Sequence, residues 1–134
     1  MKNLSLIGLL ALLLVSACKK DDDRTLAYSL NTPFLLAFDQ TATCNCGAPT
    51  IALVNIEDSR CPRLVECFWE GEVIVTLDLD GVLLELGISP NEGVSRNGII
   101  DGYNIKLLEV TPYPETDNNI PLNKYQVKLE VEKL

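Results

Sequence analysis

Fourteen consecutive residues of this 134-residue chain, "DSRCPRLVECFWEG" at positions 58–71, concentrate side chains that could do chemistry. They include two cysteines, two arginines, three acids and the only Trp of the sequence. Cysteine thiolates can bind zinc, a pair of carboxylates can hydrolyse a glycosidic bond, and an Arg beside an aromatic ring can form part of a ligand site. The stretch could therefore be an active site, a metal site or a piece of scaffold.

The composition excludes several kinds of catalytic site. The chain contains no His, which removes the base of Ser-His-Asp and Cys-His catalysis and the commonest metal ligand. It also lacks a Gly-rich phosphate-binding loop. The acidic segment "DLDGVLLE" at 78–85 does not have the twelve-residue spacing of an EF-hand calcium loop. We therefore expect no cofactor and no metal ion.

The cysteines favour disulfides over a metal site. Apart from Cys18 near the N-terminus there are four, and an even number in an exported chain is typical of disulfides, with three pairings available to four cysteines. We predict that Cys61 bridges Cys67 across a compact loop. Cys44 and Cys46 are then the two cysteines that remain, and we assign them to each other. The alternative is a four-thiolate zinc site, although the C-x-C and C-x₅-C spacings differ from the usual C-x₂₋₄-C knuckles.

The residue types of the 58–71 stretch suit a scaffold. We expect Trp69 to be buried over the Cys61–Cys67 bridge, because Trp packs on the disulfides of β-sandwiches in this way. Arg60 is expected to pair with a neighbouring acid, which could be Asp58, Glu66 or Glu70. The alternative is that Arg60, Trp69 and Glu70 form a ligand patch on the surface.

The stretch also resembles a motif, D-S-R-C-P-x₄-C-x-W-x-G, found in a group of uncharacterised exported bacterial proteins. The matching residues are Asp58, Ser59, Arg60, Cys61, Pro62, Cys67, Trp69 and Gly71. Cys44 and Cys46 lie outside the motif, so the resemblance implies nothing about their pairing. It implies a β-sandwich and transfers no function.

The N-terminus has the features of a secretory signal. Lys2 precedes an apolar run of twelve residues, 4–15, which is too short to span a bilayer as a helix. The run ends in "LVSAC", which resembles the lipobox of bacterial lipoproteins. This resemblance implies that residues 1–17 are removed and that Cys18 becomes the lipidated N-terminus. The alternative is an ordinary cleaved signal with a chance cysteine.

The charged run "KKDDDR" follows Cys18 directly and predicts a flexible acidic tether over residues 18–25. A Lys followed by acids after the lipid-bearing cysteine resembles the surface-export signal of Bacteroidetes lipoproteins. That resemblance implies a lipid-anchored protein at the outer membrane or cell surface. The alternative is a plain solvated spacer.

The net charge limits the partners of the protein. The formal charge of the chain is −8, and removal of residues 1–17 takes away Lys2 and brings it to −9. Nucleic acid is excluded as a partner because its binding depends on Lys and Arg that neutralise phosphates. Anionic membrane surfaces also repel such a chain, so the lipid would have to hold it at the membrane.

Alternating apolar and polar residues predict one all-β domain over residues 26–134. The clearest run is 72–79, where every second residue is Val or Leu, and the Asp80-Gly81 pair after it predicts a tight hairpin. The other predicted strands are 32–38, 40–44, 49–57, 82–88, 103–110 and 124–134. About seven short strands with polar turns favour an antiparallel β-sandwich or small barrel with Ig-like or Greek-key connections.

The order of these segments gives finer expectations. The segments 32–38 and 40–44 are expected to pair as an entry hairpin. The strand at 103–110 is expected to carry apolar residues on both faces. The segments 89–98 and 111–121 are predicted to be loops, and the second resembles the long crossover of a Greek key.

Two classes of function follow from these observations. The first is a non-enzymatic binding or structural module of the cell envelope that contacts protein or glycan. The alternative is a small hydrolase with an acidic site, or an enzyme inhibitor. Acids with raised pKa values around an open cleft would favour the hydrolase, whereas an exposed aromatic patch would favour binding.

Overall fold

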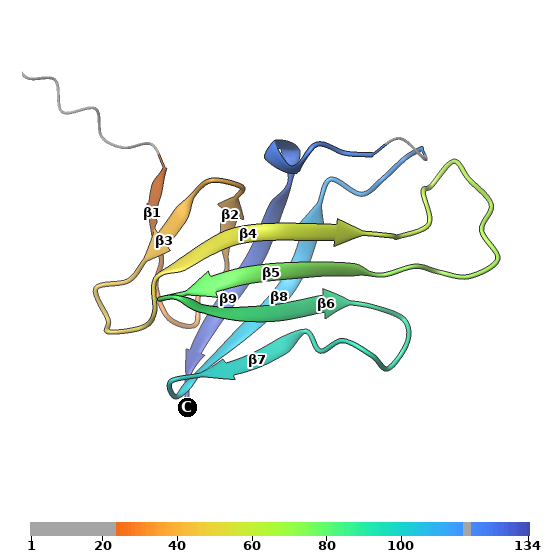
Figure 1. Ribbon diagram of the computed structural model, residues 1–134. Coiled ribbons are helices and arrows are strands. Elements are labelled where there is room, and N and C mark those ends of the chain that lie inside the picture. The colour runs from red at the N-terminus through yellow and green to blue at the C-terminus, as the bar shows by residue number, and fades with distance from the viewer. Residues whose placement is uncertain (1–23, 117–118) are drawn as a thin grey trace, which may run out of the picture.

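The computed structural model describes residues 24–116 and 119–134, which form two β-sheets packed against each other around one core (Figure 1). The nine strands of this part of the chain are β1 (Thr25–Ala27), β2 (Phe34–Ala37), β3 (Thr41–Thr43), β4 (Ile51–Asp58), β5 (Val73–Leu79), β6 (Val82–Ile88), β7 (Asn97–Ile100), β8 (Tyr103–Thr111) and β9 (Gln126–Lys133). A 3₁₀ turn, η1 (Leu122–Lys124), is the only helical element among the described residues. The predicted all-β sandwich is confirmed, and the two sheets do not close into a barrel.

Short connections build most of each sheet. The first sheet has the strand order β1-β3-β4-β5-β6, and the second has the order β2-β9-β8-β7. All neighbouring strands are antiparallel except β1 and β3, which are parallel. The strands β3 to β6 and β7 to β9 are meanders, in which each strand pairs with the next one along the chain.

The core between the sheets comes from strands with a period of two. In β5 and β9 every second side chain is fully or almost fully buried, as predicted. These side chains are Val73, Val75, Leu77, Leu79, Val127, Leu129 and Val131. Burying one such side chain stabilises the fold by about 1.5–3 kcal/mol. No polar or charged residue of the described part belongs to this core.

A β-bulge explains why the strand at 103–110 carries apolar residues on both predicted faces. The pairing of β8 with β9 slips between Leu107 and Glu109, so the side chains change faces at this point. Leu107 and Val110 are both buried, whereas Leu108 is exposed. A strict alternation cannot produce this arrangement.

Two predicted connections are wrong. The segments 32–38 and 40–44 contain β2 and β3, but β2 pairs with β9 and β3 with β4, so they lie in different sheets. Asp39, with φ 66°, lies in the turn between them. The segment 111–121 is not a Greek-key crossover, because it joins β8 to β9, which are antiparallel neighbours.

Two edge strands were not predicted. β1 begins at Thr25, inside the predicted tether, and β7 begins at Asn97, inside the predicted loop 89–98. They have three and four residues, which is too few to show an alternating pattern. The folded part therefore starts one residue earlier than expected.

The predicted hairpin at Asp80-Gly81 is confirmed. Both residues have positive φ, 52° and 91°, and the Gly81 amide donates to Asp78 Oδ1 at 2.6 Å. The pair Asp101-Gly102, with φ 51° and 80°, has the same conformation and joins β7 to β8. This second Asp-Gly pair could have been used to predict, from the sequence, the hairpin that contains β7.

The predicted signal segment 1–17, Cys18 and the tether up to residue 23 lie outside the described residues. Within residues 24–116 and 119–134, no helix is long and apolar enough to cross a membrane.

Candidate functional site

The 58–71 stretch starts at the last residue of β4 and makes up most of the loop between β4 and β5, which extends beyond the end of the sandwich (Figure 1). At the base of the loop the Ser59 amide and hydroxyl donate to the Glu72 carbonyl oxygen at 2.8 and 3.0 Å. A Cβ on Gly71 would lie 1.6 Å from the Ser59 carbonyl oxygen, so only glycine allows the two arms to approach so closely. We call residues 58–60 and 71–72, together with the side chain of Tyr125 that bonds to Asp58, the neck and residues 61–70 the tip.

Arg60 fastens the neck to the sandwich. Its Nε and Nη2 donate to Asp58 Oδ1 and Oδ2 at 2.8 and 2.7 Å, which makes a bidentate ion pair. Its Nη1 donates to the Val110 carbonyl oxygen at 2.9 Å, and Nη2 donates to the Pro112 carbonyl oxygen at 3.0 Å. The side chains of Asp58 and Arg60 are only 6% and 10% exposed. The prediction that an acid holds Arg60 is confirmed, and the acid is Asp58.

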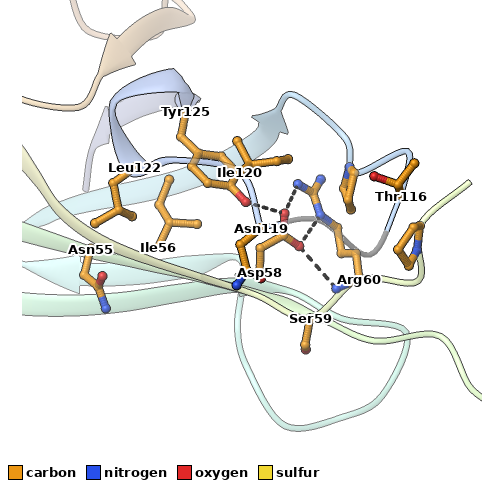
Figure 2. A pocket seen from close by; sticks show the side chains of 12 residues that line it. Asn55, Ile56, Asp58, Ser59, Arg60, Thr116, Asn119, Ile120, Leu122 and Tyr125 are labelled. Carbon is orange, nitrogen blue, oxygen red and sulfur yellow. Dashed lines mark hydrogen bonds and ion pairs between the residues drawn. The ribbon is translucent and has the colours of Figure 1, made fainter.

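Tyr125, just before β9, completes the neck (Figure 2). Its hydroxyl donates to Asp58 Oδ2 at 2.9 Å. Burial acts to raise the pKa of Asp58, but hydrogen bonds from Arg60 and Tyr125 and the charge of Arg60 outweigh it, so this pKa is lowered. Burial, followed by the hydrogen bond to Asp58 and its charge, raises the pKa of Tyr125 to about 12. At neutral pH the neck therefore contains an ionised carboxylate and a neutral phenol.

A second tyrosine, Tyr113 in the loop between β8 and β9, supports the tip. Its hydroxyl donates to the Cys61 carbonyl oxygen at 2.8 Å. The guanidinium carbons of Arg60 and Arg63 lie 4.7 and 5.1 Å from the centre of its ring, within the range of cation–π contacts. Two backbone amides of the tip also donate to carbonyl oxygens of the β8–β9 loop, at 3.0 and 2.9 Å. The tip therefore has fixed partners on one side.

Both predicted disulfides are present. Cys61 pairs with Cys67 and closes the tip, whereas Cys44 pairs with Cys46 in the turn after β3. A hollow of about 410 Å³, lined in part by Tyr28, lies beside the second bridge. The four cysteines thus form two separate bridges and no four-thiolate site. Within residues 24–116 and 119–134, no three His, Cys, Asp or Glu side chains are grouped so that they could hold a metal ion.

The tip exposes four apolar side chains within six consecutive residues. Phe68 is fully exposed, and Trp69, Leu64 and Val65 are 78%, 76% and 39% exposed. The prediction that Trp69 is buried beside the Cys61–Cys67 bridge is therefore wrong. The bridge closes a loop that extends beyond the sheets, so neither sheet presents a face that could bury the indole (Figure 1). The sequence did indicate this exposure, because these apolar residues lie between two predicted strands and not within one.

The three residues of the candidate ligand patch are divided between two open hollows. Arg60 is engaged in the neck, whereas Trp69 and Glu70 are exposed on the tip. Arg60 and Glu70 line an open hollow of about 320 Å³ together with Arg96. Trp69 and Glu70 line another, of about 230 Å³, together with Asn91. Sequence patterns did not single out the other exposed apolar residues of the tip, which are Leu64, Val65 and Phe68.

An open hollow of about 380 Å³ lies over the neck (Figure 2). Its lining includes Asp58, Arg60 and Tyr125, whose polar groups are bonded to one another. A carboxyl that acts as a general acid at neutral pH needs a raised pKa, but the pKa of Asp58 is lowered. The hydrogen bond and the charge of Lys106 lower that of Glu132, on β9, as well. These carboxylates have the properties of ion-pair partners.

Comparison of the chain with family models, with curated proteins and with solved structures finds no match in any of the three. The neck is polar and internally paired, whereas the tip is apolar and largely exposed.

Proposed function

We propose that the protein is a non-enzymatic binding module of the bacterial cell envelope, anchored by lipid at Cys18 at the outer membrane or cell surface. The observation that supports a binding role is the disulfide-closed tip, which exposes Leu64, Phe68 and Trp69 within six residues. Exposed apolar area is unfavourable in water, and a contiguous patch of it is typical of an interaction site. A partner that covers the tip would remove this area from water.

The neck favours binding because it orders the tip before a partner arrives. Arg60 alone makes four side-chain hydrogen bonds, two to Asp58 and two to backbone oxygens of β8 and the loop after it. Ordering a flexible side chain on binding costs about 0.5–1.5 kcal/mol, and a preformed loop avoids part of this cost. The tip is therefore built to be recognised as a rigid shape.

The lipid anchor is supported by the apolar run 4–15, the sequence "LVSAC" and the charged tether. Cys18→Ser is expected to leave an unprocessed precursor or to release the protein from the membrane fraction, as measured by fractionation and immunoblotting. Cys46→Ser, which changes a cysteine outside the lipobox, is the control and should remain in the membrane fraction. Normal processing and equal membrane retention of the two variants would contradict the anchor.

The binding role is tested with the full-length protein purified from envelopes in detergent. The variant Phe68→Ser/Trp69→Ser is compared with Val54→Ser/Leu83→Ser, which removes two exposed apolar side chains from β4 and β6. We expect the control to co-purify with the same partner as the wild type and the tip variant to lose it at least tenfold. If the tip variant retains the partner, the tip is not the binding surface.

An enzyme inhibitor is the second candidate, because a rigid loop that protrudes from a sandwich can enter the cleft of an enzyme. Both candidates use the same tip, so they differ only in whether binding lowers the enzymatic activity of the partner. The activity of the co-purified partner is measured with wild-type protein and with Phe68→Ser/Trp69→Ser. Inhibition by the wild type alone would favour the inhibitor over a simple binding module.

A further inference from the structure

The apolar side chains of the tip lie among acids. Glu66 and Glu70 are exposed on the tip, and Glu72 follows in the neck. Arg63 is the one basic residue between positions 61 and 72, and its guanidinium lies over the ring of Tyr113. Arg96 also lines a hollow with Glu70, whereas Arg60 is neutralised by Asp58. The carboxylates of Glu66, Glu70 and Glu72 therefore outnumber the two remaining guanidinium groups, and the local charge is negative, as is that of the whole chain, −8. A surface that covers the tip has to accommodate carboxylates as well as aromatic rings.

These acids disfavour a membrane as the occupant. Anionic lipid headgroups repel carboxylates, and inserting Phe68 and Trp69 into a bilayer would carry Glu66 and Glu70 toward its apolar interior. A glycan is disfavoured for a different reason, because its hydroxyl groups need hydrogen-bond partners. Leu64 and Phe68 offer none, so on the tip only the indole N–H of Trp69 and the charged groups of Arg63, Glu66 and Glu70 could pair with them.

The position of the tip in the fold points to the same kind of occupant. The chain enters the sandwich at β1, which lies at the end of the molecule opposite the tip (Figure 1). A protein held by a tether that precedes β1 presents the tip away from its own anchor. The tip would then face other molecules of the envelope and not the membrane that holds the lipid.

We infer that the tip binds a protein whose docking surface is an apolar groove with Lys or Arg at its rim. Phe68 and Trp69 fill the groove, and Glu66 and Glu70 pair with the basic rim. Buried aromatic side chains supply most of the affinity of such interfaces, while complementary charge at the rim speeds the encounter and fixes the orientation. This inference deepens the proposed function and rests on it.

The occupant is identified by photo-crosslinking of the full-length protein in the cells that produce it. The photoreactive amino acid p-benzoylphenylalanine replaces Phe68, which is fully exposed, and in a control replaces Leu83, which is exposed on β6. We expect light to join position 68, but not position 83, to one protein. The peptide attached at position 68 should contain apolar residues flanked by Lys or Arg.

A second pair of variants tests the charged rim. Glu66→Lys/Glu70→Lys, in the background with the crosslinker at position 68, is expected to lower the yield of the adduct at least tenfold. Glu85→Lys/Glu109→Lys makes the same change in net charge at exposed positions on β6 and β8 and should leave the yield unchanged. This control separates the local charge of the tip from the charge of the whole molecule.

The outcomes distinguish failure of this inference from failure of the proposed function. An adduct with lipid or glycan alone would overturn the inference, while the tip would remain a binding surface. A protein adduct whose yield is insensitive to Glu66→Lys/Glu70→Lys, or whose attached peptide lacks basic residues, would overturn the basic rim. If no adduct forms and Phe68→Ser/Trp69→Ser co-purifies with the same proteins as the wild type, both the inference and the binding role fail.

Discussion

The neck and the tip of one loop reverse the usual distribution of residue types. The neck buries polar side chains, among them Asp58 and Arg60, and gives them bonded partners. The tip, a few residues away, leaves Phe68 and Trp69 in solvent. Since polar groups normally lie outside and large apolar groups inside, each departure needs a reason. Stability explains the neck, and the external partner that we propose would explain the tip.

This contrast has a direct consequence for mutagenesis. Substitutions in the neck should change the free energy of unfolding and affect binding only through the fold. Substitutions in the tip should change binding and leave the free energy of unfolding nearly unaltered. A tip substitution that strongly changes the free energy of unfolding, or a neck substitution that changes binding without affecting the fold, would show that the two regions are not separate.

The largest effect is expected from Arg60→Ala. The substitution removes four hydrogen bonds and leaves the carboxylate of Asp58 buried without its counterion. Breaking a buried pair in this way costs about 3–5 kcal/mol, a large share of the roughly 5–15 kcal/mol that stabilise a domain. Thermal unfolding is the measurement, and Arg63→Ala, in the exposed part of the same loop, is the control. An unfolding midpoint for Arg60→Ala close to that of the control would contradict the structural role of the neck.

The next largest effect is expected from Gly71→Ala. The added Cβ would meet the Ser59 carbonyl oxygen at 1.6 Å, so the two arms of the neck must move apart. Forcing an extra methyl group into such a contact costs about 1–3 kcal/mol. Gly93→Ala is the matched control, because nothing lies within 4 Å of the Cβ it would add. Equal stability of the two variants in urea would show that the arms are not held together as described.

A smaller effect, with a characteristic dependence on pH, is expected from Tyr125→Phe. The wild-type pKa of Asp58 is lowered, so its ionised form stabilises the fold above the unfolded-state pKa of about 3.9. This stabilisation is lost as the pH falls through the folded-state pKa. Removing the Tyr125 hydroxyl takes away one donor to Asp58 and should cost about 1 kcal/mol at neutral pH.

Because the loss of this donor raises the folded-state pKa of Asp58, acid destabilisation of Tyr125→Phe should begin at a higher pH than in the wild type. The stability difference between the two proteins should be largest near neutral pH and shrink below both pKa values. Urea unfolding at a series of pH values from 7 to 2 provides the test. A difference that is constant with pH would indicate lost packing and not a lost hydrogen bond to a carboxylate.

The sequence predicts the parts of the fold that depend on local pattern. The alternation in β5 and β9 identified the core correctly because each strand buries one face against the opposite sheet. The slip of register after Leu107 is set by pairing with a strand some twenty residues away, so it leaves no local pattern. Likewise, the sequence predicted that Arg60 pairs with one of three nearby acids, Asp58, Glu66 or Glu70. It could neither select Asp58 nor predict the bond to the Val110 carbonyl oxygen.

The error at Trp69 has a different origin. The expectation of burial came from sandwiches in which a disulfide joins the two sheets and a Trp packs on it in the core. Here the Cys61–Cys67 bridge joins two points of one loop, and neither cysteine belongs to a strand of either sheet. The C-x₅-C spacing predicted the bridge correctly but contained no information about what surrounds it.

The smallest effect on stability is expected from Trp69→Ala. This substitution tests most directly whether the tip differs from the neck in its contribution to stability. A buried Trp would cost about 3–5 kcal/mol on truncation, but an indole that is 78% exposed has few contacts to lose. The change in the free energy of unfolding should therefore stay within about 0.5 kcal/mol, the usual range for surface substitutions. Thermal unfolding of wild type and variant gives this number, and retention of the partner is measured on the same samples. An unchanged midpoint with weakened partner binding is the result expected of the tip. A strongly lowered midpoint would place Trp69 with the neck, and the division between the two regions would fail.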